Sequence, residues 1–458
     1  MDSNMERRFT CQACGAEFAV DFSFCPRCGA PRTPSRPASA FDREYDFIVA
    51  GGGLAGCAAA LQAARRGKKT LLLEKSNILG GLATLGLINL FVPMCNGLGK
   101  QICFGLAEEF MRDSIKLGYD TLPEEWRDGE PSQPTRARCM TKFSPYLFAM
   151  QLDEKLRAEG VDILFDCAVA RPVMDGARVK GVVALCKDGL RVFRARIFAD
   201  TTGDADMLRA AGVPTRAGAN YFTWIGALAT AESCAKAAGG RPDDALSGKI
   251  CGGGINLFGD NQPEGVPRWS GLSVEEVTDY LLANHDAMLE KVRALVAEKG
   301  RGAFEIARIP LMPQFRTTAC IVGDETFRYD SVYNHAADSI CAINDFEHRC
   351  HLFEVPFGTI CRHDAPNLLT AGRSASAEGF GWDVLRVIPP AILTGQAAGE
   401  TAALALDEGR DVAGVSIREL QRRLEDDRVM VHFPDSYIPE GRPFSFRGFT
   451  HGSAPGHF

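Results

Sequence analysis

The sequence lacks any long hydrophobic run. The best candidate, residues 384–406, is interrupted by two prolines and by polar and charged side chains that include Arg386 and Glu400, so we expect no membrane span. The first residues, Met-Asp-Ser-Asn-Met-Glu-Arg-Arg, lack the apolar core of a signal peptide. We therefore expect a cytoplasmic protein.

The sequence also lacks an excess of basic residues. The net charge is −7 and the pI is about 5.7, so no nucleic-acid partner is expected. The sequence shows no internal repeat. Its 458 residues, 46% of them hydrophobic, are enough for two or three domains with sizeable cores. These properties are typical of an ordinary soluble protein.

Cysteine, in contrast, is abundant. In a large chain without a signal peptide, the 16 cysteines are expected to be thiols and metal ligands rather than disulfides. Two matching Cys-x-x-Cys-Gly segments contain Cys11 and Cys14, and Cys25 and Cys28. Four thiolates suit tetrahedral zinc, and so short a unit needs a metal to fold. We predict a structural zinc ribbon with a short β-hairpin between the cysteine pairs; the alternatives are a redox thiol pair or an iron–sulfur cluster.

The most informative segment is residues 46–56, Asp-Phe-Ile-Val-Ala-Gly-Gly-Gly-Leu-Ala-Gly. An apolar strand leads directly into Gly51, Gly53 and Gly56, a small-residue helix follows, and a second apolar strand ends at Glu74. This order predicts a dinucleotide site. The glycines allow a tight turn, close approach of a pyrophosphate, and close packing of helix and strand, while the acid can accept hydrogen bonds from a ribose.

Changes in composition divide the chain. We predict strands at 162–165, 168–174, 179–185 and 191–199, the last three as an antiparallel meander, and helices at 54–66, 104–117, 145–159, 274–299 and 389–406. The predicted organisation is a zinc ribbon at 1–30, a linker at 31–43, a nucleotide-binding domain at 44–215 and 351–430, an inserted substrate domain at 216–350, and a tail without regular structure at 431–458.

Further motifs resemble those of FAD-dependent oxidoreductases with the glutathione-reductase-like flavoprotein fold. The chain is similar to the branch that has a GGxAT signature after the first helix–strand unit. The matching segments are Gly80–Phe91, Arg316–Gly323, Asn367–Arg373, Arg386–Pro389 and Gly395–Gly399. The resemblance implies an α/β fold in which a Rossmann-like FAD-binding domain with an antiparallel β-meander carries an inserted α+β substrate domain.

The resemblance also implies particular cofactor contacts. The first glycine turn would hold the FAD pyrophosphate, the segment around Gly80 would lie along the flavin, and the helix from Pro389 would direct its N-terminus at the flavin pyrimidine, where reduction places negative charge. The expected cofactor-binding residues are Gly51, Gly53, Leu54, Ala55, Gly56, Glu74, Lys75, Gly80, Gly81, Thr84, Val169 or its neighbour Ala168, Gly203, Asp204, Gly372, Arg373, Arg386 and Pro389.

Catalytic groups are less clearly marked. Arg316 lies among apolar residues in the inserted domain and could bind a carboxylate, or form a structural salt bridge. His335 and His351 are candidate proton carriers, although single histidines more often have structural roles. Cys57 could be a reactive thiol at a helix N-terminus but is more readily explained as a packing residue. Cys95 follows the predicted flavin loop and is a weaker redox candidate.

Two functions follow. The first is an FAD-dependent oxidoreductase that transfers a hydride between a small organic substrate and flavin. Because no second dinucleotide motif is present, reoxidation would use the substrate, a quinone, a carrier protein or oxygen. The second is a flavin-containing redox sensor or binding protein whose zinc ribbon contacts a protein partner. The oligomeric state is open, and a homo-oligomer is one option.

Overall fold

The main body is built on one mixed sheet. The computed structural model describes residues 9–11, 16–18, 25, 27, 41, 43–240 and 242–440. The strand order is β7 (Asp162–Leu164), β4 (Thr70–Leu73), β3 (Glu44–Ala50), β10 (Gly189–Asp200), β9 (Arg178–Cys186) and β8 (Cys167–Asp175), with β18 (Leu368–Thr370) beside β10. Neighbours from β7 to β10 run parallel, as do β10 and β18. The predicted α/β class is therefore confirmed.

The antiparallel meander is also confirmed. β8 pairs with β9 and β9 with β10, so β10 belongs to the meander at its start and to the parallel sheet at its end. Gly176, with φ of 59°, and Gly189, with φ of 108°, lie at the two tight turns. The Asp-Gly pairs in the sequence are typical of such turns.

Side chains on β3 alternate between two cores. Phe47 and Val49 belong to one cluster of buried residues, and Ile48 and Ala50 belong to a second. Successive strand residues point to opposite faces, so both faces of the sheet are covered. The first core includes two central helices, α1 (Leu54–Arg65) and α8 (Ile388–Glu408), while the second includes residues of the meander.

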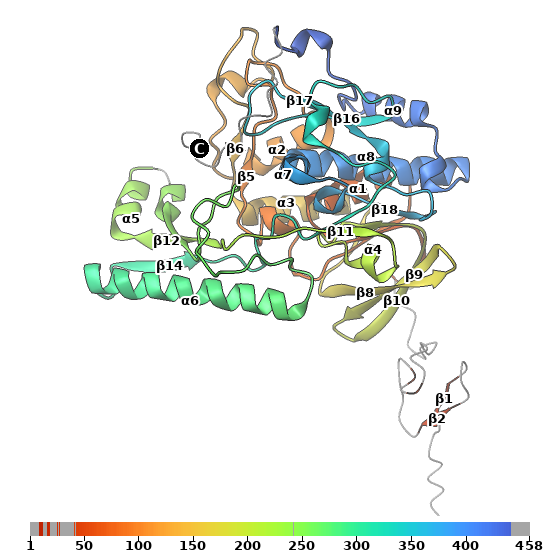
Figure 1. The fold of residues 1–458 in the computed structure, drawn as a ribbon, viewed down its shortest axis with the longest axis horizontal. Helices are drawn as coiled ribbons and strands as arrows, with labels where there is room; N and C mark the ends of the chain where they lie inside the picture. Colours follow the sequence, from red (N-terminus) through yellow and green to blue (C-terminus); the bar gives the residue numbers. More distant parts are fainter. Residues whose placement is uncertain are drawn as a thin grey trace, which may run out of the picture.

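Close approach of α1 and α8 depends on two glycines. A Cβ added to Gly395 would lie 2.2 Å from the carbonyl oxygen of Ala55, and one added to Gly399 would lie 2.3 Å from that of Ala59. The further helices of the main body include α2 (Gly105–Lys116), α3 (Pro145–Ala158), α7 (Gly379–Leu385) and α9 (Ile417–Asp426). The sequence predicted both ends of α2 and of α3 to within one residue. Figure 1 shows α1 and α8 at the centre of the main body.

The inserted segment forms its own small layer. A three-stranded sheet of β12 (Ile225–Thr230), β13 (Gly248–Cys251) and β14 (Phe304–Arg308) packs against α6 (Val274–Lys299), with α5 (Ala231–Ala238) nearby. The predicted bounds of α6 agree with the structure, and Ser273 caps it by accepting a hydrogen bond from the Glu276 amide. In Figure 1 this layer lies at the lower left, away from α8.

The insertion ends earlier than predicted. β11 (Thr215–Ala217) pairs with β15 (Ala319–Ile321), and these strands connect the insertion to the main body. The following hairpin, β16 (Ser339–Asn344) and β17 (Leu352–Pro356), packs into the main core. The predicted boundary at residue 350 is therefore about thirty residues too late, since apolar residues such as Phe327 and Ile340 are buried against the main body.

At the N-terminus, β1 (Phe9–Thr10) pairs with β2 (Glu17–Phe18). One strand of this pair precedes Cys11. The hairpin predicted between the two cysteine pairs falls mostly outside the described residues and stays a prediction. Most of the linker at 31–43 and residues 441–458 lie outside the described residues. The described part of the tail includes a short 3₁₀ helix at Asp435–Tyr437, which the sequence did not predict.

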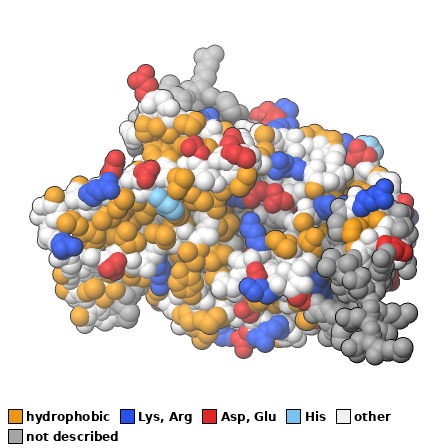
Figure 2. All heavy atoms as spheres, turned by 90° about the horizontal axis from the view of Figure 1, so that it is seen from below, with side chains coloured by type: hydrophobic (Ala, Val, Ile, Leu, Met, Phe, Trp, Pro, Cys, Tyr) orange, Lys and Arg blue, Asp and Glu red, His pale blue; other side chains and the backbone are white. Residues whose placement is uncertain are grey.

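Among the described residues, no helix combines the length and apolar character needed to cross a membrane. The insertion nevertheless presents exposed apolar side chains on α6, where Val274 is 73%, Leu282 57% and Leu289 47% exposed. Figure 2 shows hydrophobic side chains gathered on this side of the molecule, at the left of the view from below.

Candidate functional site

A cavity of about 440 Å³ lies where the parallel strands end. Gly51 follows β3, Glu74 follows β4, Thr201 follows β10 and Ala371 follows β18, and all four line its wall. Ligands of open α/β sheets bind outside the carboxyl ends of the strands, and the volume is within the range of small-molecule sites. The location agrees with the site predicted from the first glycine motif.

The three glycines of that motif have different surroundings. Gly51 has φ of 105°, and a Cβ there would lie 2.5 Å from the Thr201 carbonyl oxygen. A Cβ on Gly56 would lie 1.9 Å from the Gly51 carbonyl oxygen, so this residue allows close packing but does not line the cavity. Gly53 lines the cavity, and a Cβ there would meet no atom within 4 Å. Backbone at Gly53 is therefore open to a ligand.

Two helix N-termini are directed at the cavity. Leu54 and Ala55 of α1, and Ile388 and Ala391 of α8, line it. Neither helix has a side-chain hydrogen bond at its N-cap or an acidic residue in its first turn. Helix N-termini carry partial positive charge, so these two ends favour an anionic ligand. The α1 end also exposes amide donors, whereas Pro389 and Pro390 have no N–H in the first turn of α8.

Glu74 is 7% exposed and holds the adjacent backbone. Its carboxylate oxygens accept hydrogen bonds from the Gly52 amide at 2.6 Å and from the Ser76 amide at 2.7 Å. Lys75 and Val169 line the same part of the cavity. The predicted ribose acid is thus placed on the wall, with its orientation fixed before any ligand binds.

The GGxAT segment forms another part of the wall. Gly80 and Gly81 have φ of 100° and 55° and both line the cavity. Thr84 lies behind them; it is buried, and its hydroxyl donates to the Leu79 carbonyl oxygen at 2.6 Å. A Cβ on Gly80 would lie 2.4 Å from the Thr84 methyl group, so Thr84 supports this turn from behind.

Arg373 joins three segments beneath the cavity. Its guanidinium donates to the Gly203 carbonyl oxygen at 2.6 Å, to Asp204 Oδ1 at 2.6 Å, and to the Phe315 carbonyl oxygen. Gly203, Gly372 and Arg373 line the cavity, but Asp204 does not. The predicted contact of Asp204 with the cofactor is therefore replaced by a supporting role, because its carboxylate is held by Arg373. Pro389 also lies off the wall, buried at the start of α8.

Arg316 and Arg386 lie close enough to influence each other. Arg386 lines the cavity and donates to Asp383 Oδ1 at 2.6 and 2.9 Å. Arg316 lies off the wall and donates to the carbonyl oxygens of Ile255 and Asn256. Burial, with a smaller effect of the Arg386 charge, lowers the pKa of Arg316 to about 10. Arg316 is half-buried, and among the described residues no carboxylate forms an ion pair with it, so its charge could bind an anion.

Neither predicted histidine lines the cavity. His335 Nδ1 lies 2.6 Å from Glu354 Oε1 and its Nε2 lies 3.0 Å from Asp435 Oδ1, and these contacts raise its pKa. His351 Nδ1 lies 2.6 Å from the hydroxyl of Tyr329, and burial lowers its pKa. The structure thus separates both histidines from the wall that the glycine motifs form.

The two candidate thiols are buried packing residues. Cys57 has no exposed surface and its thiol donates to the Gly52 carbonyl oxygen at 3.3 Å. Burial raises the pKa of both Cys57 and Cys95. For Cys57, this effect of burial is larger than the decrease in pKa expected at a helix N-terminus. Neither lines the cavity. The packing interpretation of Cys57 therefore holds.

Sequence reasoning missed part of the wall. Asp206 at the start of α4 (Asp206–Ala210) lines the cavity with its side chain 46% exposed, and partial desolvation together with nearby Asp204 and Asp200 raises its pKa to about 6. The other missed wall residues are Leu73, Ser76, Leu82, Ala83, Leu85, Cys167, Thr201, Thr202, Leu311, Met312, Ala371, Ile388 and Ala391. Most adjoin predicted residues, but Leu311 and Met312 come from the insertion and carry no motif.

The predicted metal ligands are only half described. Cys11 and Cys25 are buried, at 4% and 2% exposure, whereas Cys14 and Cys28 lie outside the described residues. The Cys11 amide donates to the Ala16 carbonyl oxygen at 2.8 Å. The four-cysteine site therefore stays a prediction.

A family model described as FAD dependent oxidoreductase matches residues 46–246 and 321–424. The first matched segment extends into the inserted layer, and the two segments together include the whole cavity wall except Leu311 and Met312. A tRNA uridine 5-carboxymethylaminomethyl modification enzyme, MnmG of Geobacter sulfurreducens, is 30% identical over 173 residues, covering 36% of this chain and 25% of that protein. The match thus spans about a quarter of that relative.

Solved structures with a similar fold were found as well. One is p-nitrophenol 4-monooxygenase PnpA of Pseudomonas putida, with 14% identity, a TM-score of 0.46, and coverage of 84% of this chain and 85% of the other. Another is a geranylgeranyl bacteriochlorophyll reductase-like protein of Thermoplasma acidophilum, with 14% identity, a TM-score of 0.39, and coverage of 86% and 95%.

Proposed function

Because this chain belongs to the FAD dependent oxidoreductase family, we propose that it transfers a hydride between a small organic substrate and bound FAD. The observation that supports this most directly is the convergence of three glycine turns and two uncapped helix N-termini on one cavity. FAD, when bound there, supplies the two-electron redox chemistry, and the protein supplies binding and orientation.

The residues present fit a cofactor with a diphosphate. Gly53 has no side chain, and the space beside its backbone is open to a ligand. The N-terminus of α1, which follows Gly53, supplies amide donors. Glu74 has its carboxylate fixed at the wall and can accept from a ribose hydroxyl. The N-terminus of α8 favours negative charge at a second position on the wall. Each element thus matches a chemically different part of FAD.

We propose an anionic substrate. Arg386 on the wall and Arg316 behind it place two guanidinium groups near the cavity, and Asp383 pairs with only the first. A carboxylate on the substrate would restore charge balance around Arg316 and could be bound in a bidentate manner. Leu311 and Met312 add apolar side chains to the wall of the cavity.

The reaction is tested by anaerobic rapid mixing of the FAD-loaded protein with small organic carboxylates and their uncharged esters. We expect the carboxylate series to bleach the flavin absorbance, with a primary isotope effect when the transferred hydrogen is replaced by deuterium. Arg316→Gln should raise KM for the carboxylate more than tenfold, whereas Arg410→Gln, on an exposed side chain just after the C-terminal end of α8, should not. Bleaching without an isotope effect would exclude hydride transfer as the rate-limiting step.

We propose separately that the four N-terminal cysteines bind structural zinc and that the unit docks a protein partner. Two Cys-x-x-Cys pairs supply the four ligands that tetrahedral zinc prefers. Metal analysis of the full chain should give about one zinc per chain, reduced in Cys14→Ser, with the FAD content unchanged. Iron in place of zinc, or zinc content unaffected by Cys14→Ser, would contradict this assignment.

A further inference from the structure

Two cysteines meet beside the cavity. Cys167 begins β8, Cys186 ends β9, and their sulfur atoms lie 3.0 Å apart. They are direct partners across the antiparallel pair. Opposed residues of such a pair have Cα separations of about 4.5–5.5 Å, which lie within the range that a disulfide spans. Closing the bond requires a sulfur movement of only about 1 Å.

The two thiols differ in accessibility and charge. Cys167 is 2% exposed and lines the cavity, whereas Cys186 is half-buried. The Cys167 thiol hydrogen bond lowers the pKa of Cys186, and the positive charge of Arg191 acts in the same direction. The same contact raises the pKa of Cys167. Cys186 is therefore the thiol that an oxidant in solution meets first, and Cys167 is positioned to resolve it.

The pair is connected to the ligand-binding wall through the backbone. The Cys167 amide donates to the Glu74 carbonyl oxygen at 3.0 Å, and the Glu74 carboxylate holds the Gly52 amide of the glycine turn. Ala168, the next residue, also lines the cavity. A movement of Cys167 toward β9 thus changes the wall on which a nucleotide would rest.

We propose that Cys167 and Cys186 form a reversible, peroxide-sensitive disulfide whose formation weakens cofactor binding. The Cys186 thiolate attacks one peroxide oxygen; the S–O bond forms, the O–O bond breaks, and the departing hydroxide takes a proton to become water. Cys167 sulfur then attacks Cys186 sulfur, and the S–O bond breaks as a second water leaves with the Cys167 proton. Two electrons pass from the thiols to hydrogen peroxide. This modification lies beyond the proposed hydride transfer.

The test treats the full chain with stoichiometric hydrogen peroxide, followed by differential alkylation and peptide mass spectrometry. We expect a peptide linked through Cys167 and Cys186 to appear before other cysteines react and to disappear with dithiothreitol. Cys186→Ser and Cys186→Ala should abolish it, whereas Cys234→Ser, which removes an exposed thiol on α5, should not. Preferential oxidation of other cysteines would overturn the proposal.

The second readout is the FAD dissociation constant of the same samples after removal of bound cofactor. It should rise at least threefold on oxidation of the unaltered chain, remain constant in Cys186→Ser, and return to its first value on reduction. A linked peptide with an unchanged dissociation constant would refute the connection to the cofactor. A linked peptide in a chain that binds no FAD at all would instead refute the proposed function, so the two failures are distinguishable.

Discussion

Single glycines determine where a ligand reaches the backbone. Gly56 allows α1 to pack against the turn, whereas Gly53 leaves open space on the wall of the cavity. The packing role that the sequence motif assigned to Gly56 agrees with the structure, whereas the approach of a diphosphate to Gly53 stays a prediction. The motif also included Gly56 among the cofactor-binding residues, although the structure places it behind the turn.

Asp206 leads to a prediction about pH. Its pKa of about 6 exceeds the ordinary value of 3.8, so the carboxyl is charged at pH 7.5 and neutral at pH 5. A charged carboxylate on the wall repels a diphosphate, and protonation removes that repulsion. FAD affinity should therefore increase several-fold as the pH falls from 7.5 to 5. Equilibrium titration of FAD across this range is the measurement.

Asp206→Asn provides the control for this prediction. The variant should bind FAD at pH 7.5 as tightly as the unaltered chain does at pH 5, with little dependence on pH between them. If both proteins show the same pH dependence, Asp206 is not the group responsible.

The residues that sequence reasoning misplaced share a physical cause. Asp204 was expected to contact the cofactor, but its carboxylate is held by Arg373 and does not line the cavity. His335 and His351 were selected for their ordinary pKa, which says nothing about position. Leu311 reaches the wall only through the folding of the insertion, and a single sequence contains no signal for that contact.

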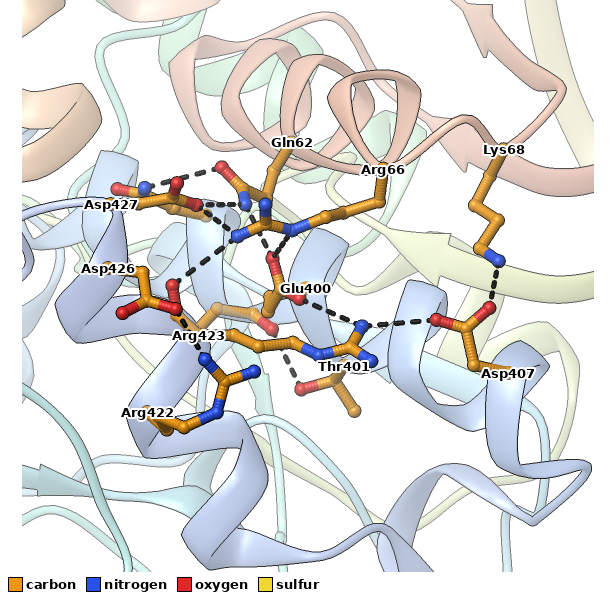
Figure 3. Close-up of polar contacts among 12 residues, drawn as sticks. Gln62, Arg66, Lys68, Glu400, Thr401, Asp407, Arg422, Arg423, Asp426 and Asp427 are labelled. Atoms are coloured by element: carbon orange, nitrogen blue, oxygen red, sulfur yellow. Dashed lines mark hydrogen bonds and ion pairs between the residues drawn. The ribbon is translucent and has the colours of Figure 1, made fainter.

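At the scale of elements, α1 and α8 are held by packing near the cavity and by charge farther away. Figure 3 shows the charged group that joins α1, α8 and α9. Glu400, fully buried, accepts from Arg66 at 2.7 Å and lies 3.5 Å from Arg423. Arg66 also pairs with Asp427 at 2.7 Å. This network sets the relative position of two helices whose N-termini reach the wall.

Removing Glu400 should therefore be costly. Glu400→Ala removes the buried negative charge that pairs with the guanidinium groups of Arg66 and Arg423. We therefore expect the free energy of unfolding to fall by about 3–5 kcal/mol. Asp426→Ala removes a partner of exposed Arg422 from the same group of helices and should cost less than about 1 kcal/mol. Urea unfolding of both variants measures the difference; equal losses would show that burial of Glu400 is unimportant.

At the scale of the whole molecule, the sequence predicted the central architecture well and the domain edges poorly. Strands β3 and β4 are apolar runs with clear ends, and helix α6 begins after a capping residue, Ser273. The return to the main body after β15 has no comparable signal, because Phe327 and Ile340 are apolar residues that either core could bury. Long-range packing, rather than local preference, decides that boundary.

The two large cores predict that the N-terminal unit is separable. Among the described residues, both cores consist of residues from Phe41 onward, so deletion of residues 1–40 should leave the unfolding temperature and the FAD dissociation constant of the main body unchanged, while bound zinc is lost. Differential scanning calorimetry and FAD titration check this. A loss of FAD binding in a folded protein would show that the unit contributes to the cofactor site.

The central claim is that backbone at Gly53 faces a diphosphate, and Gly53→Ala tests it most directly. Its φ of −64° suits alanine, and its added Cβ meets no protein atom, so stability should change by less than about 1 kcal/mol. We expect the FAD dissociation constant to rise at least tenfold, while the exposed Gly414→Ala leaves it unchanged. A stable Gly53→Ala protein that binds FAD as tightly as the unaltered chain would contradict the account.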